Sequence, residues 1–126
     1  MKTYSLEVTR WARQDLRSIA WYLAKKSGSI DFGINYTDRI ENNLSRLCVN
    51  PHHQIIDEPP FREAGLRRYT IKNYVAYYLI DEDSNRVVVL AVLYGGRFWQ
   101  RLLPERMRAW QSRRQRTLVR VTARIR

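Results

Sequence analysis

The order of two hydrophobic periodicities along the chain is the strongest constraint on its fold. Up to about residue 49, apolar residues recur every three or four positions, as they do on one face of a helix. From Leu66 onward, the stretches LRRYTIK, YVAYYLID and RVVVLAVLY are rich in the β-branched and aromatic residues that favour strands. The chain therefore predicts a helical part followed by a sheet.

Local signals mark where the predicted elements begin and end. Tyr4, Leu6 and Val8 alternate with polar residues, which predicts a short first strand. Thr9 is suited to cap the helix that follows, and Gly28 is suited to end it. The second helix is predicted over residues 31–49, before Asn50-Pro51. The apolar stripe of the first helix contains Ala12, Leu16, Ile19, Ala20 and Leu23, and that of the second contains Phe32, Tyr36, Ile40, Leu44, Leu47 and Cys48.

The three later strands are separated by typical turn residues. Asn73 marks the first turn and Asp83-Ser84-Asn85 marks the second, so the strands are predicted to form consecutive antiparallel hairpins. The apolar run from Val87 to Leu93 predicts a central strand that is buried on both faces. The predicted fold class is α+β in the order β-α-α-β-β-β, with a helical hairpin packed on an antiparallel sheet and a basic C-terminal extension.

The positive charge is concentrated near the C-terminus. The 126 residues contain 23 Lys+Arg and 12 Asp+Glu, a formal net charge of +11. Residues 101–126 account for +8 of this charge, with nine arginines and Glu105. We therefore divide the chain into a domain at residues 1–103 and an arginine-rich extension at residues 104–126. The alternation of Val119, Val121, Ala123 and Ile125 with polar residues is typical of a strand with a basic face, and such a segment suits nucleic acid or an acidic protein as its partner.

Other kinds of chemistry find little support in the sequence. Cys48 is the single cysteine, which excludes an intrachain disulfide and a cysteine zinc cluster. No apolar run is long enough to span a membrane, and the N-terminus lacks the apolar core of a signal peptide, so a cytoplasmic protein is expected. His52-His53 and Asp81-Glu82-Asp83 are interpreted as solvated loops. We expect no metal, no cofactor, no small-molecule substrate and no membrane partner.

Three stretches together resemble the RelE/ParE superfamily of bacterial toxins from type II toxin–antitoxin modules, which includes plasmid stabilisation proteins. The first runs from Ala12 to Ile19 with Tyr22, and the second is Leu47 with Asn50-Pro51. The third comprises Gly65-Leu66-Arg67-Arg68, Tyr74 to Tyr78, and Val87 to Arg97 followed by Leu102-Leu103. The resemblance covers about residues 3–103. It implies a growth-arresting toxin that a cognate antitoxin protein neutralises.

The superfamily has two main activities, and the resemblance is closer to the ParE branch. RelE-like members cleave mRNA on the ribosome with a cluster of Lys and Arg on the sheet and, in many members, a C-terminal Tyr. Here Arg68, Lys72 and Arg97 match such cations, but Val75 replaces a typical arginine and Leu103 replaces the tyrosine. The ending Leu93-Tyr94-Gly95-Gly96-Arg97 is more similar to ParE-like toxins, which bind and inhibit DNA gyrase.

The leading hypothesis is therefore a gyrase inhibitor without catalytic residues. The alternative is a ribosome-dependent, metal-independent mRNA endonuclease that uses Arg68, Lys72 and Arg97. A further alternative is a non-toxic, basic nucleic-acid-binding protein. The residues predicted to contact the target or the antitoxin are Arg67, Arg68, Tyr94, Arg97, Trp99 and Arg101.

Overall fold

The computed structural model describes the backbone of residues 3–125 and the side chains of residues 3–113. Its helices and strands follow in the order β1 (Ser5–Val8), α1 (Arg10–Ser27), α2 (Ile30–Ser45), a 3-10 turn η1 (Arg46–Cys48), α3 (Phe61–Ala64), β2 (Arg67–Ile71), β3 (Tyr74–Asp81), β4 (Arg86–Tyr94) and α4 (Trp99–Ile125). The predicted α+β class and the order of its elements are confirmed, and α3 is an additional short helix in the segment before β2.

The sheet is mixed, whereas the sequence suggested a purely antiparallel one. Its strand order is β1-β4-β3-β2. The β2–β3 and β3–β4 pairs are antiparallel, as predicted, but β1 runs parallel to β4 with Leu6 beside Val87. Local alternation indicates a strand without indicating its neighbour, because strand pairing is decided between distant parts of the chain. No helix among residues 3–125 is long and apolar enough to cross a membrane.

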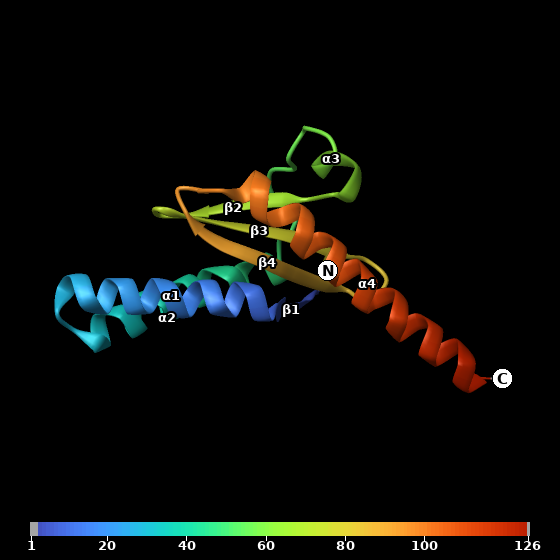
Figure 1. The fold of residues 1–126 in the computed structure, drawn as a ribbon, viewed down its shortest axis with the longest axis horizontal. Helices are drawn as coiled ribbons and strands as arrows, with labels where there is room; N and C mark the ends of the chain where they lie inside the picture. The colour runs from blue at the N-terminus through green and yellow to red at the C-terminus, as the bar shows by residue number, and fades with distance from the viewer. Residues whose placement is uncertain (1–2, 126) are drawn as a thin grey trace.

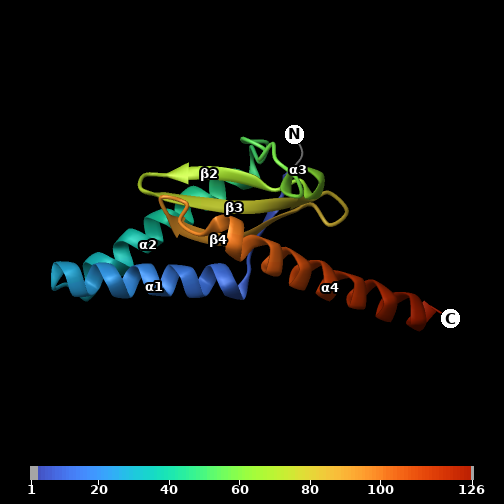
Figure 2. The ribbon, with the colours of Figure 1, turned by 45° about the horizontal axis from the view of Figure 1, so that its top comes forward.

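The helical hairpin covers one face of the sheet (Figures 1 and 2). The Thr9 hydroxyl accepts a hydrogen bond from the Ala12 amide at the start of α1, and Gly28 ends the helix with φ of 75°. The two helices approach closely at Gly33, where an added Cβ would lie 2.3 Å from the carbonyl oxygen of Ala20. Gly33 therefore faces α1, and its neighbour Phe32 is turned outward with 47% exposure instead of joining the core stripe.

The core lies in two layers, one on each side of the sheet. Between the helical hairpin and the sheet, residues of α1 and α2 pack against alternate residues of β3 and β4, including Val87 and Val89. On the opposite face, Val88 and Leu90 pack with Phe61 of α3 and with α4. Strand β4 is thus buried on both faces, which confirms the prediction for the run from Val87 to Leu93.

Helix α4 crosses the second face of the sheet and then extends away from the body (Figure 1). Leu103, Met107 and Trp110 are buried in this second layer, so the chain stays packed on the body well beyond residue 103. The backbone is helical as far as Ile125, where the alternation at residues 119–125 had suggested a strand. Arginine, leucine and alanine have high helix propensity, which favours continuation of the helix that began at Trp99.

Candidate functional site

Tyr94 and Arg97, two of the predicted contact residues, lie together at the end of β4. Gly95 and Gly96 have φ of 56° and 71°, so the chain turns sharply there through a conformation that suits glycine. This turn places the Arg97 guanidinium 5.2 Å from the centre of the Tyr94 ring, at the distance of a cation–π contact. Both side chains are exposed.

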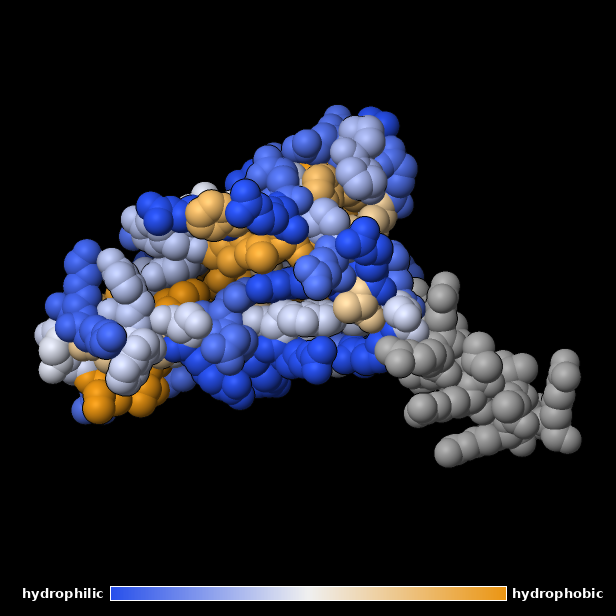
Figure 3. Space-filling model, in the orientation of Figure 1, coloured by the Kyte–Doolittle hydropathy of each residue, from blue (hydrophilic) through white to orange (hydrophobic). Residues whose placement is uncertain are grey.

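Tyr94 and Arg97 also line a groove of about 700 Å³ between α1 and the adjoining ends of β3 and β4. We call it the tyrosine groove, because Tyr22, Tyr36, Tyr74 and Tyr94 contribute to its walls. The other lining residues are Asp15, Ser18, Ile19, Leu23, Lys26, Asn73, Val92, Leu93 and Arg97. In Figure 3, apolar atoms line a hollow between α1 and the segment that follows β4, with hydrophilic atoms around it.

Tyr74 is the centre of the aromatic cluster. Its ring packs edge-on against Tyr36 and Tyr94, with centroids 5.9 and 5.5 Å away. Burial raises the pKa of Tyr74 above its ordinary value, and the nearby phenols of Tyr36, Tyr94 and Tyr22 raise it further. The Tyr74 hydroxyl therefore stays protonated at neutral pH, and each tyrosine hydroxyl of the groove is a potential hydrogen-bond donor.

The rings of Tyr22, Tyr36 and Tyr94, which surround Tyr74, each contact a lysine or arginine side chain. The Lys26 ammonium is 5.6 Å from the Tyr22 ring and donates a hydrogen bond of 3.3 Å to its hydroxyl. Arg97 covers Tyr94, and the Lys72 ammonium lies 5.7 Å from the Tyr36 ring. The groove therefore combines aromatic walls with positive charge at its rim.

Asp15 contributes a carboxylate whose charge is already compensated. Its two oxygens accept hydrogen bonds of 2.8 and 3.3 Å from Arg106 on α4, and it also accepts one of 3.0 Å from the Val92 amide. Arg106 in addition donates to the carbonyl of Leu90 at 3.0 Å. Both side chains are about 15% exposed, and the pair ties α1, β4 and α4 together beside the groove.

The structure separates Arg68 from Lys72, although simple alternation along a strand puts them on one face. Arg68 lies opposite Tyr77 of β3, and Tyr77 belongs to the second core layer. Lys72 has φ of 53° in the turn after β2, which breaks the alternation, and its ammonium instead reaches Tyr36 on α2. The two cations therefore serve opposite sides of the sheet.

Tyr77 has a buried hydroxyl on the second face. No residue whose side chain the structure describes provides this hydroxyl with a hydrogen-bond partner. Burial raises the pKa of Tyr77, and the positive charge of Arg68 opposes that effect. The indole of Trp99 stacks on Tyr77 at 5.5 Å and also contacts Phe61 at 4.8 Å, so Trp99 is held mainly by the core.

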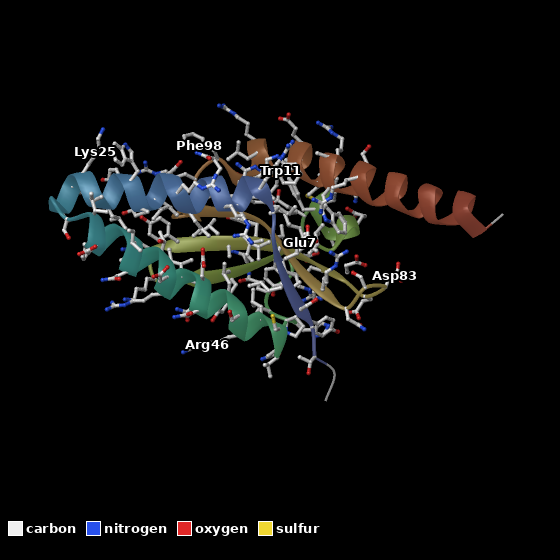
Figure 4. The ribbon with its side chains drawn as sticks, turned by 90° about the horizontal axis from the view of Figure 1, so that it is seen from below. Glu7, Trp11, Lys25, Arg46, Asp83 and Phe98 are labelled. Carbon is white, nitrogen blue, oxygen red and sulfur yellow. The ribbon has the colours of Figure 1, made fainter. Side chains whose placement is uncertain are left out.

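The remaining predicted contact residues have more local surroundings. Arg67 donates a hydrogen bond of 2.6 Å to the carbonyl of His53, which attaches the preceding loop to β2. Arg101 is exposed, and its guanidinium lies 5.8 Å from the ring of Phe98. Phe98 is 64% exposed and lies at the edge of the body in the view of Figure 4.

Sequence reasoning did not identify most of the tyrosine groove. The sequence pattern assigns Tyr36 to the core stripe of its helix, the family resemblance alone draws attention to Tyr22 and Tyr74, and no pattern singles out Lys26. These residues come from three separate elements, and their positions show no shared spacing. A signal in the sequence was available only for Tyr94 and Arg97, which follow one another across a Gly-Gly turn.

Comparison with known proteins identifies the family of the chain. A family model described as the ParE toxin of the type II toxin–antitoxin system, parDE, matches residues 6–99. No curated protein sequence matches the chain closely enough to be counted as a relative.

Solved structures resemble the fold at low sequence identity. A chain from the chromosomal ParDE toxin–antitoxin system of P. aeruginosa superposes with a TM-score of 0.62 at 17% identity, covering 75% of this chain and 98% of that one. The RelBE2 toxin–antitoxin complex of Mycobacterium tuberculosis gives 0.50 at 21% identity, covering 73% and 98%. A mutant of the E. coli toxin RelE in the free state gives 0.54 at 13% identity, covering 82% and 97%. These structures support the fold, and the family match over residues 6–99 shows that the chain belongs to the ParE toxins of type II toxin–antitoxin systems.

Proposed function

We propose that this chain is a growth-arresting toxin that binds and inhibits DNA gyrase and is neutralised by a cognate antitoxin. Membership of the ParE toxin family supports the toxin role. The similar structures from the ParDE and RelBE2 systems were described as parts of toxin–antitoxin systems, which supports an antitoxin as partner. On this proposal the chain acts by binding and has no catalytic residues.

The second face of the sheet is covered, and this observation is the main support for a binding mechanism over RNA cleavage. A nuclease that cleaves RNA on its sheet needs cations around the reacting phosphate, to stabilise the additional negative charge of the transition state. Here Val75, Leu79 and Leu90 of that face are at most 5% exposed. They lie in a layer that α3 and α4 complete with Phe61 and Met107. An apolar, covered face favours a structural role for these strands.

The three cations of the nuclease alternative, Arg68, Lys72 and Arg97, also do not gather around one position where a phosphate could bind. Arg68 lies beside Tyr77 on the second face, Lys72 contacts Tyr36 on the side of the helical hairpin, and Arg97 covers Tyr94. Stabilisation of one phosphate requires donors about 3 Å from the same oxygen atoms. The sheet separates Arg68 from the other two cations, which favours binding of a macromolecule over cleavage of one phosphodiester.

The test compares DNA supercoiling with RNA integrity. We expect expression of the chain alone to arrest growth, and co-expression of the protein encoded beside it to restore growth. The purified chain should inhibit supercoiling of relaxed plasmid by purified gyrase while cellular mRNA remains intact. Exposed Arg97 and Arg101 are expected to contact gyrase, so replacing each with alanine should weaken inhibition about 10-fold, whereas exposed Arg108→Ala serves as the matched control.

Two outcomes would contradict the proposal in different ways. Growth that continues normally on expression would refute the toxin role. Cleaved mRNA with unchanged supercoiling would favour the nuclease, and Arg68→Ala, Lys72→Ala and Arg97→Ala should then abolish the cleavage.

The alternative of a nucleic-acid-binding tail needs a truncation placed by the structure. Removing residues 104–126 would also remove buried Met107 and Trp110 and the Arg106–Asp15 pair. Removing residues 114–126 leaves those contacts in place. Loss of growth arrest with this shorter truncation would favour a function that depends on the arginine-rich end.

A further inference from the structure

We propose that the outer side of the helical hairpin, facing away from the sheet, is an interface through which two copies of this chain form a symmetric dimer. We call this surface the hairpin face, and Figure 4 views the molecule from that side. It is defined by six exposed residues, three from each helix: Arg13, Arg17 and Trp21 of α1, and Ile34, Asp38 and Glu41 of α2. The proposed function makes no use of this surface, so the two proposals can fail independently.

Helical spacing places the hairpin face opposite the core. Leu16 and Ile19 of α1 are buried in the layer between the hairpin and the sheet. Arg17 and Trp21 are both exposed and stand four residues apart, so they lie together on the other side of the same helix. The equivalent residues of α2 are likewise exposed while its apolar stripe is buried.

The two helices contribute to one continuous surface. A shallow depression between them is lined by Arg17 of α1 and Glu41 of α2, so these two side chains lie at the same level along the helices. Nearer the connection between the helices, the close approach of Gly33 to the backbone of α1 puts Trp21 and Ile34 at a common level as well.

The two halves of the hairpin face have opposite charges. Arg13 and Arg17 form a basic row on α1, and Asp38 and Glu41 form an acidic row on α2. None of these four side chains forms an ion pair with another residue whose side chain the structure describes. A complementary partner must therefore present an acidic row to α1 and a basic row to α2.

A second copy of the chain provides this exchanged arrangement by symmetry. A two-fold axis that lies in the contact plane, parallel to the helices, places α1 of each copy on α2 of the other. Arg17 then meets Glu41 of the second copy, and Trp21 meets Ile34 of the second copy, because each pair lies at one level along the helices. Every contact occurs twice, which doubles the effect of each complementary pair.

The hairpin face also has an apolar part beside its charged rows. Trp21 is 63% exposed and Ile34 is 48% exposed. Ile30, which is 70% exposed, continues this patch toward the connection, and Figure 3 shows hydrophobic residues at the lower left, where α1 and α2 join. A tryptophan buried among apolar neighbours is typical of the residues that contribute most to interface stability.

The distribution of charge favours a second copy over an anionic polymer. Asp38 and Glu41 would repel the phosphates of a nucleic acid laid across the hairpin face. The dimer also keeps the basic C-terminal regions apart, because α4 packs on the opposite face of each sheet (Figure 1). Both sheets and both helical hairpins separate the two α4 helices, a distance well above the screening length of about 8 Å at physiological salt.

The experiment exchanges the charges and measures the dimer dissociation constant of the full chain by sedimentation equilibrium, over about 1–100 µM. We expect Arg17→Glu and Glu41→Lys each to weaken self-association about 10-fold or more, because each variant alone brings like charges together at two places. An equimolar mixture of the two variants should associate within about threefold of the unmodified chain, since both charge pairs are then opposite again.

Matched controls come from the other side of α2. Arg39 is exposed but lines a separate depression that includes Lys72, and Phe32 is 47% exposed and contacts the ring of Tyr36. We expect Arg39→Glu and Phe32→Ala to change self-association less than about threefold, and Trp21→Ala to weaken it about 10-fold. Thermal unfolding of each variant verifies that the fold is retained.

Several outcomes would refute the dimer. The chain may not stay monomeric over the whole concentration range, the charge variants must associate more weakly than Arg39→Glu, and their mixture must recover. If the chain alone is monomeric and the protein encoded beside it binds Arg17→Glu and Trp21→Ala more weakly than the controls, the occupant of the hairpin face is that protein and the proposal is wrong. Growth arrest is not a readout, so failure of the proposed function leaves this test unaffected.

Discussion

Replacing Arg106 with alanine should destabilise the protein by about 3 kcal/mol, because it leaves a largely buried carboxylate without its partner. Arg106 donates two hydrogen bonds to Asp15, of 2.8 and 3.3 Å, and a third of 3.0 Å to the Leu90 carbonyl. After the substitution Asp15 keeps only its bond from the Val92 amide, and the Leu90 carbonyl loses a donor. The pair also holds α4 on the sheet, so the change weakens the cover of the second face.

The magnitude follows from the environment of the pair. Removing one partner of a fully buried ion pair costs about 3–5 kcal/mol. Both side chains are about 15% exposed, so water can partly solvate the remaining carboxylate and the lower end of that range applies. For a chain of this length, a loss of about 3 kcal/mol should lower the Tm by about 10 °C.

The assay is urea unfolding followed by tryptophan fluorescence, with thermal unfolding by circular dichroism as a second measurement. Arg108→Ala is the control, since Arg108 lies on the same helix but is exposed; we expect it to change stability by less than about 0.5 kcal/mol. A double-mutant cycle with Asp15→Ala should give a coupling of about 2 kcal/mol. The reasoning is refuted if Arg106→Ala is no more destabilising than Arg108→Ala, or if the cycle shows no coupling.

Three further predictions concern the core. Tyr77→Phe should stabilise the protein by about 0.5–1 kcal/mol, because the Tyr77 hydroxyl is buried without a hydrogen-bond partner among the described side chains. Tyr78→Phe should instead destabilise it by about 1–2 kcal/mol, because the Tyr78 hydroxyl loses its 2.6 Å hydrogen bond to the Pro51 carbonyl. Urea unfolding of both variants tests whether the two changes in stability have opposite signs. Burial raises the pKa of Tyr74, Tyr77 and Tyr78 above 10.0, so these hydroxyls lose their protons at lower pH in the unfolded chain than in the folded one. Stability should therefore fall as the pH rises through and above about 10, and it should fall less in Tyr77→Phe. Unfolding curves that show no such fall across this pH range would contradict the prediction. Gly33→Ala should lower stability by about 2–3 kcal/mol, since its Cβ would lie 2.3 Å from the Ala20 carbonyl oxygen and force α1 and α2 apart; Asn35→Ala, at an exposed position of the same helix, is the control for the Tm measurement.

The residues predicted several elements correctly because those elements depend on local chemistry. Thr9 and Gly28 lie at the two ends of α1, as their capping chemistry predicts. Thr9 provides a side-chain hydrogen-bond acceptor at the start of the helix, and Gly28 adopts the left-handed conformation at its end. The run from Val87 to Leu93 is apolar at every position and rich in valine, a combination that favours a strand covered on both faces. Each of these signals lies within the element that it describes.

Contacts between distant segments determined the rest. The parallel pairing of β1 with β4 joins residues about 80 positions apart, and no local alternation specifies it. The turn at Lys72 moved that side chain to the helical side of the sheet, and the close approach at Gly33 turned Phe32 outward. Both effects depend on packing that forms only when helices and strands meet.

The candidate site shows the same division most clearly. The sequence by itself determined that Tyr94 and Arg97 stand on either side of a Gly-Gly turn. Only the tertiary structure brought Tyr22 and Tyr36 to Tyr74 and engaged Asp15 with Arg106, which leaves Lys26 and Arg97 as the uncompensated cations of the groove. The physical reason is that a groove's charge depends on which ionic groups neutralise one another, and those pairings form between helices and strands that are remote in sequence.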